Sequence, residues 1–324
     1  MSRLLISAAI ALIAFPAFAQ NAAAPGTMTE SVSVGYVMIP FTVLGDHGRP
    51  IKDLRNAEVD LMVDGARVRS DMFEKSQNAP VSFTILLDGS GSMALAGKMD
   101  SAFAAIGALI GHRRPGDDFA LYVFAESQAI EVAPFTENPA DITRALGKVT
   151  PYGKTAFFDA LATMPERSRL GRNPSRAIIL LSDGIDNASS LTRGALAQQL
   201  QGIAVPIYSL GLREPAAQPD KRKQPREDMS DIGLLNEVAT LTGGKLYLGN
   251  TPQQIAEAVS HIEDDLRAQY LIGFAPTGKG AVKYRTISLK LTGRARAVRV
   301  RAGYLGTEPP MVASRNKSNE RKGS

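Results

Sequence analysis

The chain has 324 residues, of which 44% are hydrophobic and 21% are charged, a balance that excludes a protein without a buried core. It contains no cysteine, which excludes both disulfide bonds and thiolate metal sites. The formal net charge of +5 is mildly basic and does not by itself establish nucleic acid as a partner.

The first 19 residues have the pattern of a secretory signal peptide. Arg3 precedes an apolar run at residues 4–14, and Ala17-Phe18-Ala19 forms an Ala-x-Ala cleavage site. A membrane anchor is the alternative, but the apolar run is too short to cross a bilayer comfortably. No later stretch of the chain approaches the length of a membrane span. We therefore expect cleavage after Ala19 and export to a bacterial periplasm or the extracellular space, with no transmembrane span in the mature chain. In that compartment, anionic envelope surfaces are better neighbours for the positive charge than nucleic acid, so no nucleic-acid partner is expected.

The next part of the chain is predicted to be rich in β-strands. Residues 20–31 are small and polar and are expected to form a flexible lead, followed by an N-terminal β segment at residues 32–79. The first half of this segment is rich in β-branched and aromatic residues. The second half contains a hairpin at residues 61–68 that turns at Asp64-Gly65.

From Val81 onward, apolar strands alternate with segments of helical periodicity. The predicted strands are residues 81–87, 119–124, 130–135, 177–181, 205–210 and 245–248. The predicted helices are residues 98–112, 139–149, 156–164, 191–201, 234–241 and 252–267. The alternation predicts an α/β fold over residues 80–266, a doubly wound, mostly parallel, Rossmann-like sheet with helices on both faces. Ligand sites in such sheets lie beyond the carboxyl ends of the strands.

Residues 267–306 return to a β pattern, with predicted strands at 269–274, 284–291 and 298–301. Since neither β segment can bury a core alone, we expect residues 267–306 to pair with residues 32–79 in one β-sandwich-like domain, into which the α/β domain is inserted. The alternative is an independent N-terminal β module with a C-terminal extension of the α/β sheet. Residues 307–324 are polar and basic and are predicted to form a disordered tail.

One turn of the α/β region carries the residues of a cation site. The apolar run at residues 81–87 leads into Asp88, and Asp88, Ser90 and Ser92 alternate, so that one turn can aim three oxygens at a single point. Gly89 and Gly91 permit the backbone conformations of such a turn. Two of the three ligands are neutral, which suits a hard cation such as Mg²⁺.

Two later segments extend this pattern. Gly153-Lys154-Thr155 opens a helical run, and Leu180-Leu181-Ser182-Asp183-Gly184 ends a second buried strand. In order and spacing, the three segments resemble the von Willebrand factor A domain and its metal-ion-dependent adhesion site. The alternative interpretation is that they are three unrelated strand-to-helix turns. The resemblance implies a Mg²⁺ site, with Ca²⁺ or Mn²⁺ as other candidates. The ligands that it implies are Asp88, Ser90, Ser92, Thr155 and Asp183.

The resemblance also implies a function. In this family a carboxylate from a partner protein completes the metal shell, so the chain is expected to be an exported, metal-dependent protein-binding module of the adhesion type. The rim that meets the partner is expected to include Gly89, Gly91, Lys154 and Gly184. The segments at residues 265–274 and 303–304 are similar to bacterial secreted proteins described as VWFA-related. The alternative is a structural component of an envelope assembly, in which the metal only stabilises the loops.

Enzymatic chemistry has little support in the sequence. The histidines are His47 in a predicted turn, His112 near a helix end and His261 on the last helix of the α/β region, and no His-Glu-x-x-His zinc motif is present. Gly89-Ser90-Gly91 lacks the spacing of a nucleophile elbow. Gly153-Lys154-Thr155 lacks the glycine that a phosphate-binding loop requires at position 148. We therefore expect a protein that is not an enzyme.

Overall fold

The structure is a computed structural model that describes residues 36–76, 79–201, 203–213, 228–249, 251–293, 295 and 297–311, and, for His47 and residues 228–230, the backbone only. The predicted signal peptide and the predicted flexible lead lie outside these residues. Within the described part of the chain, every helix is too short or too polar to cross a bilayer.

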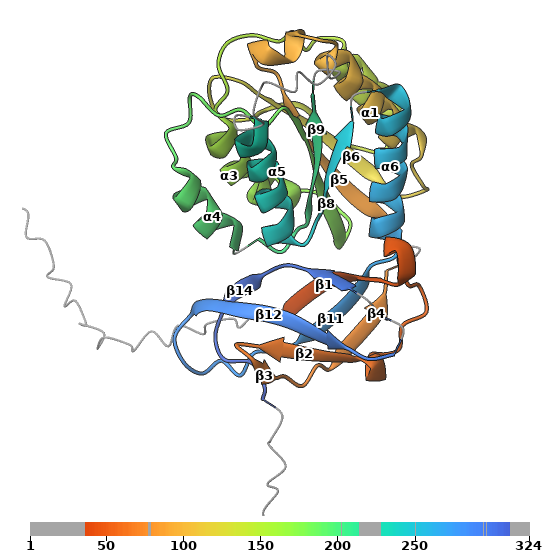
Figure 1. Ribbon diagram of the computed structural model, residues 1–324, viewed down its shortest axis with the longest axis vertical. Coiled ribbons are helices and arrows are strands. Elements are labelled where there is room, and N and C mark those ends of the chain that lie inside the picture. The colour runs from red at the N-terminus through yellow and green to blue at the C-terminus, as the bar shows by residue number, and fades with distance from the viewer. Residues whose placement is uncertain are drawn as a thin grey trace, which may run out of the picture. The chain divides into compact units, whose positions relative to one another are not determined.

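The α/β region is built on a six-stranded sheet in the order β10-β9-β8-β5-β6-β7 (Figure 1). In chain order its strands are β5 (Val81–Asp88), β6 (Asp118–Phe124), β7 (Ile130–Thr136), β8 (Ser175–Ser182), β9 (Ile207–Leu212) and β10 (Leu246–Gly249). Neighbouring strands run parallel, except that β7 pairs antiparallel with β6. All residues of the central strand β5 are buried. A strand covered on both faces has no solvent side, which explains why most of its residues are apolar and why Ser82 and Thr84 are buried with them.

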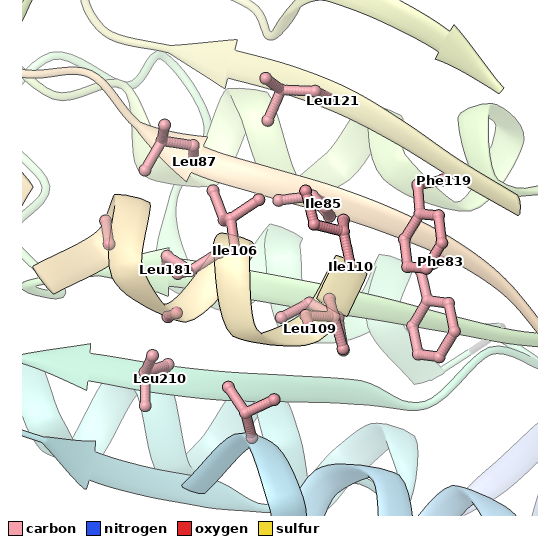
Figure 2. Close-up of a cluster of buried hydrophobic side chains, with 14 of the residues drawn as sticks. Phe83, Ile85, Leu87, Ile106, Leu109, Ile110, Phe119, Leu121, Leu181 and Leu210 are labelled. Atoms are coloured by element: carbon pink, nitrogen blue, oxygen red, sulfur yellow. The ribbon is translucent and has the colours of Figure 1, made fainter. Parts of the chain in front are cut away.

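Helices cover both faces of this sheet. They are α1 (Lys98–Gly111), α2 (Pro139–Leu146), α3 (Phe157–Ser168), α4 (Arg193–Gln201), α5 (Asp228–Thr242) and α6 (Pro252–Arg267). Figure 1 shows α1 and α6 on one side of the sheet and α3, α4 and α5 on the other. On the first side, Ile106 and Ile110 of α1 lie in the same buried cluster as Phe83, whose ring stacks on Phe119 at 5.1 Å (Figure 2). This arrangement confirms the predicted α/β class.

Three helix boundaries differ from the prediction by three residues or more. Helix α5 begins at Asp228 rather than at residue 234, α2 ends at Leu146 rather than at residue 149, and α3 continues to Ser168 instead of ending before Pro165. Proline lacks the N–H group that a helix interior uses, so a helix end is the usual expectation beside it. In α3 the buried Ser168 hydroxyl donates a 2.8 Å hydrogen bond to the Pro165 carbonyl, which supports the turn after the proline.

The remaining strands form two antiparallel sheets, in the orders β13-β1-β11-β4 and β14-β12-β2-β3. The strands before the α/β region are β1 (Val37–Leu44), β2 (Val59–Val63), β3 (Ala66–Arg67) and β4 (Met72–Lys75), with short 3-10 helices at Asp46–Gly48 and Asn56–Glu58. Those after it are β11 (Tyr270–Phe274), β12 (Lys283–Leu291), β13 (Ala297–Val300) and β14 (Gly303–Gly306). Phe41, Leu61, Tyr270 and Ile287, from both sheets, share one buried cluster. The predicted β-sandwich-like domain of N-terminal and C-terminal strands is therefore confirmed.

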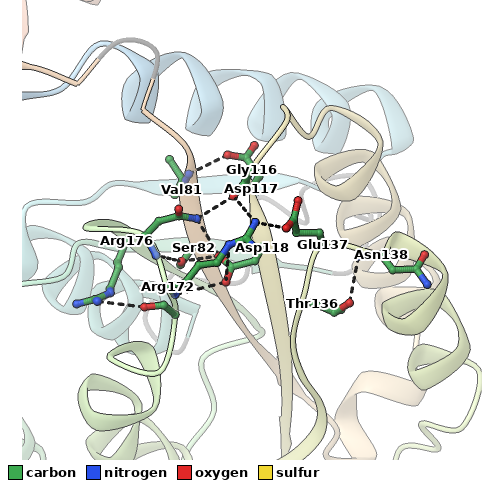
Figure 3. A network of polar contacts seen from close by, with 12 residues as sticks. Val81, Ser82, Gly116, Asp117, Asp118, Thr136, Glu137, Asn138, Arg172 and Arg176 are labelled. Atoms are coloured by element: carbon green, nitrogen blue, oxygen red, sulfur yellow. Dashed lines mark hydrogen bonds and ion pairs between the residues drawn. The ribbon is translucent and has the colours of Figure 1, made fainter.

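The two places where the chain passes between the sandwich and the α/β region lie side by side. Strands β4 and β11 are paired, and the Ser76 N–H donates to the Gln269 carbonyl at 2.9 Å. The Arg267 guanidinium donates to the Ala79 carbonyl at 2.9 Å and forms a buried ion pair with Asp117. Asp117 in turn accepts a 2.8 Å hydrogen bond from the Val81 N–H, within a polar network at the amino ends of β5 and β6 (Figure 3). A whole domain can be inserted here because its two ends are adjacent.

Two features of the sandwich test local predictions. The hairpin of β2 and β3 turns at Asp64 and Gly65, whose φ angles of 50° and 80° are those of a tight two-residue turn, as predicted. The predicted disordered tail is wrong for residues 307–311. The Thr277 N–H donates to the Glu308 carbonyl at 2.8 Å, and the Arg69 N–H donates to the Pro310 carbonyl at 2.9 Å. These backbone bonds are set by the surrounding fold, so polar composition could not reveal them; residues 312–324 lie outside the described part.

Candidate metal centre

The two predicted carboxylate ligands lie at the carboxyl ends of two neighbouring strands. Asp88 is the last residue of β5, and Asp183 directly follows β8. These strands are parallel partners with Leu87 opposite Leu181, so the two carboxylates reach the same edge of the sheet. Proteins of this fold class bind their ligands at this edge, so a cation site is expected here.

Asp88 is a fully buried carboxylate that receives a hydrogen bond on each oxygen. The Ser90 N–H donates to Oδ1 at 2.9 Å, and the Ser182 hydroxyl donates to Oδ2 at 2.6 Å. Burial raises the pKa of Asp88 to about 6, and the negative charge of Asp183 adds to this rise, while the bonds from Ser182 and Ser90 oppose it. Two carboxylates held this close in a buried place would be stabilised by a cation.

The two serines of the same turn converge. After Asp88 the chain enters a 3-10 helix at Gly91–Ala94, and the Ser90 and Ser92 hydroxyl oxygens lie 3.1 Å apart. Gly89 is required by close packing, because a Cβ atom there would lie 2.7 Å from Cγ1 of Val123. The turn therefore holds two hydroxyl groups beside the buried carboxylate.

The loop that carries Thr155 is bound to this turn through the backbone. The Tyr152 N–H donates to the Gly89 carbonyl at 2.9 Å, and the Gly91 N–H donates to the Gly153 carbonyl at 3.0 Å. Thr155 is buried, and among the described residues its hydroxyl makes no hydrogen bond, which leaves that oxygen available to a ligand.

The loop after Asp183 holds the Thr155 loop in place. The Asn187 side-chain carbonyl accepts the Thr155 N–H at 2.8 Å, and the Thr155 carbonyl accepts the Asn187 N–H at 3.0 Å. Asp186 accepts the Phe157 N–H at 2.9 Å and so stabilises the beginning of α3. No pattern in the sequence pointed to Asn187 as a contact of Thr155.

Lys98 is the charged group of the site that sequence reasoning missed. Its ammonium nitrogen lies 2.9 Å from Asp183 Oδ2, and the exposed fractions of the two side chains are only 9% and 5%. The other Asp183 oxygen accepts the Ile185 N–H at 3.3 Å. The one available signal was a lysine as the first residue of a helix, where a positive charge opposes the helix dipole.

The predicted rim residues surround these groups in different ways. Lys154 is exposed, and its backbone N–H points to the Glu126 carboxylate at 3.4 Å. Gly184 has a φ of 86°, and a Cβ atom there would lie 2.7 Å from the Asp231 carbonyl oxygen, so glycine is needed. Gly89 and Gly91 connect the turn to the Thr155 loop through their backbone hydrogen bonds with Tyr152 and Gly153.

The donor set fits a hard divalent cation. It consists of two carboxylates and three hydroxyl groups, all of them oxygen donors of the type that Mg²⁺ prefers. In the described part of the chain no group of three or more His, Cys, Asp or Glu side chains is arranged so that it could hold a metal ion. A metal ion at this edge would therefore depend on Ser90, Ser92 and Thr155 as well as on Asp88 and Asp183. A bound metal would also meet the Lys98 ammonium on Asp183.

Comparison with known proteins gives a family match over the same residues. Residues 83–185 match the family described as the von Willebrand factor type A domain. A search of curated proteins finds no match. A von Willebrand factor type A protein from Catenulispora acidiphila is 17% identical, with a TM-score of 0.48, 86% of this chain covered and 66% of that chain. An aerotolerance-related membrane protein from Bacteroides fragilis is 20% identical, with a TM-score of 0.43 and coverages of 57% and 98%. The domain of the type V pili tip protein Mfa5 from Porphyromonas gingivalis is 15% identical, with a TM-score of 0.43 and coverages of 57% and 94%.

Proposed function

We propose that this protein, in which residues 83–185 form a von Willebrand factor type A domain, is an exported, metal-dependent module that binds an acidic group of a partner protein. The observation that supports the proposal is that the three loops carrying the predicted ligands are hydrogen-bonded to one another beyond the carboxyl ends of β5 and β8. Non-enzymatic adhesion is the role expected of such a domain. The oxygen atoms that the site offers as ligands for a cation are consistent with that role.

Each residue of the site has a distinct task in this proposal. Ser90 and Ser92 offer neutral hydroxyl oxygens, and Asp88 orients their turn through its bond with the Ser90 N–H. Asn187 positions Thr155 from the neighbouring loop. A bound Mg²⁺ would supply a Lewis acid that accepts a carboxylate oxygen of the partner. If Asp88 and Asp183 both coordinated the ion directly, their two negative charges would balance its charge. If they instead act through water, the ion keeps an affinity for a carboxylate of the partner.

The surface beside the site suits a protein partner. Leu95 and Tyr152 are each 57% exposed, and both lie on loops of the site, because the Leu95 N–H bonds to the Ser92 carbonyl and the Tyr152 N–H to the Gly89 carbonyl. Exposed aromatic and aliphatic side chains beside a charged anchor are typical of protein interfaces. The exposed Lys154 adds a positive charge that would attract an acidic partner.

A second candidate function is structural, with the site only tying the loops together in an envelope assembly. It is favoured by the Lys98–Asp183 ion pair, which links the start of α1 to the loop after β8 without a metal ion. The two candidates differ in one property, because only the first requires a partner whose binding needs the cation.

The test is capture of partners from the cell envelope by the immobilised chain in Mg²⁺ and in chelator. The proposal predicts a captured protein that chelator releases, that Mg²⁺ restores, and that Asp88→Ala and Thr155→Ala fail to capture. Asp100→Ala and Thr143→Ala are matched controls, because both residues are exposed on helices and lie outside the predicted ligand set. Capture that is indifferent to chelator and to the two site substitutions would contradict metal-dependent binding.

A further inference from the structure

Lys98 occupies an unfavourable position that one contact offsets. It is the first residue of α1, preceded by Ala96 and Gly97 with φ angles of 54° and 70°. At this end of the helix the backbone dipole is positive, so an ammonium group there is disfavoured. Its side chain is also nearly removed from solvent. Both penalties are offset by the ion pair with Asp183 Oδ2 at 2.9 Å.

That ion pair gives the lysine the electrostatic role of a cation in the site. Asp183 is one of the two carboxylates that lie together at the ends of β5 and β8, and the Lys98 ammonium is bound to one of its oxygens. The other oxygen is engaged by the Ile185 N–H. A divalent cation that approached Asp183 would therefore meet a positive charge already bound there.

We propose that the Lys98 ammonium and a divalent cation compete for Asp183, so that Lys98 is the residue that sets how tightly this site holds a metal ion. The proposal rests on the proposed function, since it assumes that the site binds a cation. Residues 94–97 are exposed, so an ammonium group that leaves Asp183 has a short path to solvent. Cation binding then includes the separation of an ion pair, which lowers the affinity of the wild-type site.

The first experiment compares Mg²⁺ affinity, by calorimetry, in the wild-type chain and in Lys98→Met, which keeps the length of the side chain and removes its charge. We expect binding about tenfold tighter or more in Lys98→Met, because an opposing charge a few ångströms from the ion is removed. Lys98→Arg keeps the charge and should stay within about threefold of wild type. Lys290→Met is the control for net charge, since Lys290 is exposed on β12 of the sandwich; it should leave the Mg²⁺ affinity unchanged.

The second experiment uses the wild-type chain alone and does not depend on the folding of a variant. Lys98 is labelled with an amine-acylating reagent with and without saturating Mg²⁺, and the extent of labelling is read by mass spectrometry against Lys290. Displacement from Asp183 predicts that Mg²⁺ increases the labelling of Lys98 and leaves that of Lys290 unchanged.

The outcomes separate this proposal from the function on which it rests. Equal or weaker Mg²⁺ binding by folded Lys98→Met, or unchanged Lys98 labelling in a chain that binds Mg²⁺, would overturn the competition and leave the proposed function standing. Mg²⁺ binding by Lys98→Met alone would support the competition and contradict a metal-dependent function of the wild-type chain. An absence of Mg²⁺ binding in all four proteins would overturn both.

Discussion

The Ser182 hydroxyl donates a 2.6 Å hydrogen bond to Asp88 Oδ2 across the neighbouring strands β5 and β8, although the two residues are 94 positions apart in the sequence. The Ser182 oxygen also accepts the Gly184 N–H at 3.0 Å. One serine therefore connects the buried carboxylate of the first loop to the backbone of the third loop. The orientation of Asp88, and with it the turn that carries Ser90 and Ser92, depends on this contact.

Ser182→Ala should weaken both the fold and the site. It removes the donor to Asp88 and the acceptor for the Gly184 N–H, so we expect a loss of about 1–3 kcal/mol in the free energy of unfolding. Mg²⁺ binding should weaken in the same variant. Urea unfolding and calorimetry measure the two effects. Ser288→Ala, at an exposed position of β12, is the matched control and should change neither. Wild-type Mg²⁺ affinity in Ser182→Ala would contradict the role given to this contact.

Asn187→Ala should disturb the site without removing a predicted ligand. The substitution deletes the side-chain carbonyl that accepts the Thr155 N–H, while the bonds from the Asn187 and Ala188 N–H groups to the Thr155 carbonyl remain. We expect the Thr155 amide to exchange its hydrogen faster and the Mg²⁺ affinity to fall. Hydrogen exchange read residue by residue checks the first expectation. Unchanged protection of Thr155 would show that other contacts hold this loop.

The sequence predicted the parts of the fold that depend on periodicity and on size. The mostly apolar run before Asp88 and the alternation of strands and helices were enough to predict a parallel sheet, with the candidate ligands Asp88 and Asp183 at strand ends. The pairing of the two β segments followed from a different argument, since neither could bury a core alone.

Sequence reasoning could not predict the contacts that depend on where distant side chains meet. Lys98 was assigned only to the beginning of a helix, and its bond to Asp183 is set by the arrangement of α1 against the loop after β8. Asn187 acts through a backbone N–H of another loop, which no local pattern reveals. Residues 307–311 were misassigned for the same reason, because backbone hydrogen bonds to other segments hold them.

Gly184→Ala should be strongly unfavourable at a position where the site needs glycine. Its φ of 86° is disfavoured for alanine, and the added Cβ atom would meet the Asp231 carbonyl oxygen at 2.7 Å. We expect lower stability together with weaker Mg²⁺ binding. Gly107→Ala in α1 is the matched control, since a Cβ atom there meets open space. That substitution should stabilise the chain by about 0.5–1 kcal/mol. A neutral effect of Gly184→Ala on thermal unfolding would contradict the reported geometry.

Arg267→Met should destabilise the chain without affecting the metal centre. Its buried ion pair with Asp117 lies at the amino ends of the strands, whereas the centre lies at their carboxyl ends. Leaving Asp117 without its partner should cost about 3–5 kcal/mol in the free energy of unfolding. Arg169→Met, which breaks an exposed pair with Glu166 on α3, is the control and should cost about 0.5 kcal/mol or less. Denaturant unfolding measures both, and equal effects of the two substitutions would contradict the importance of burial.

The most direct test of the metal centre is a calorimetric titration of Mg²⁺ into the wild-type chain, Asp88→Ala, Thr155→Ala and the control Asp100→Ala, with far-UV circular dichroism to show that each is folded. We expect one site per chain in the wild-type and Asp100→Ala proteins. We expect binding to be lost or weakened by about tenfold or more in the two site variants, since each removes an oxygen ligand or the carboxylate that orients the others. Unchanged Mg²⁺ affinity in folded Asp88→Ala protein would contradict a metal site formed by these three loops.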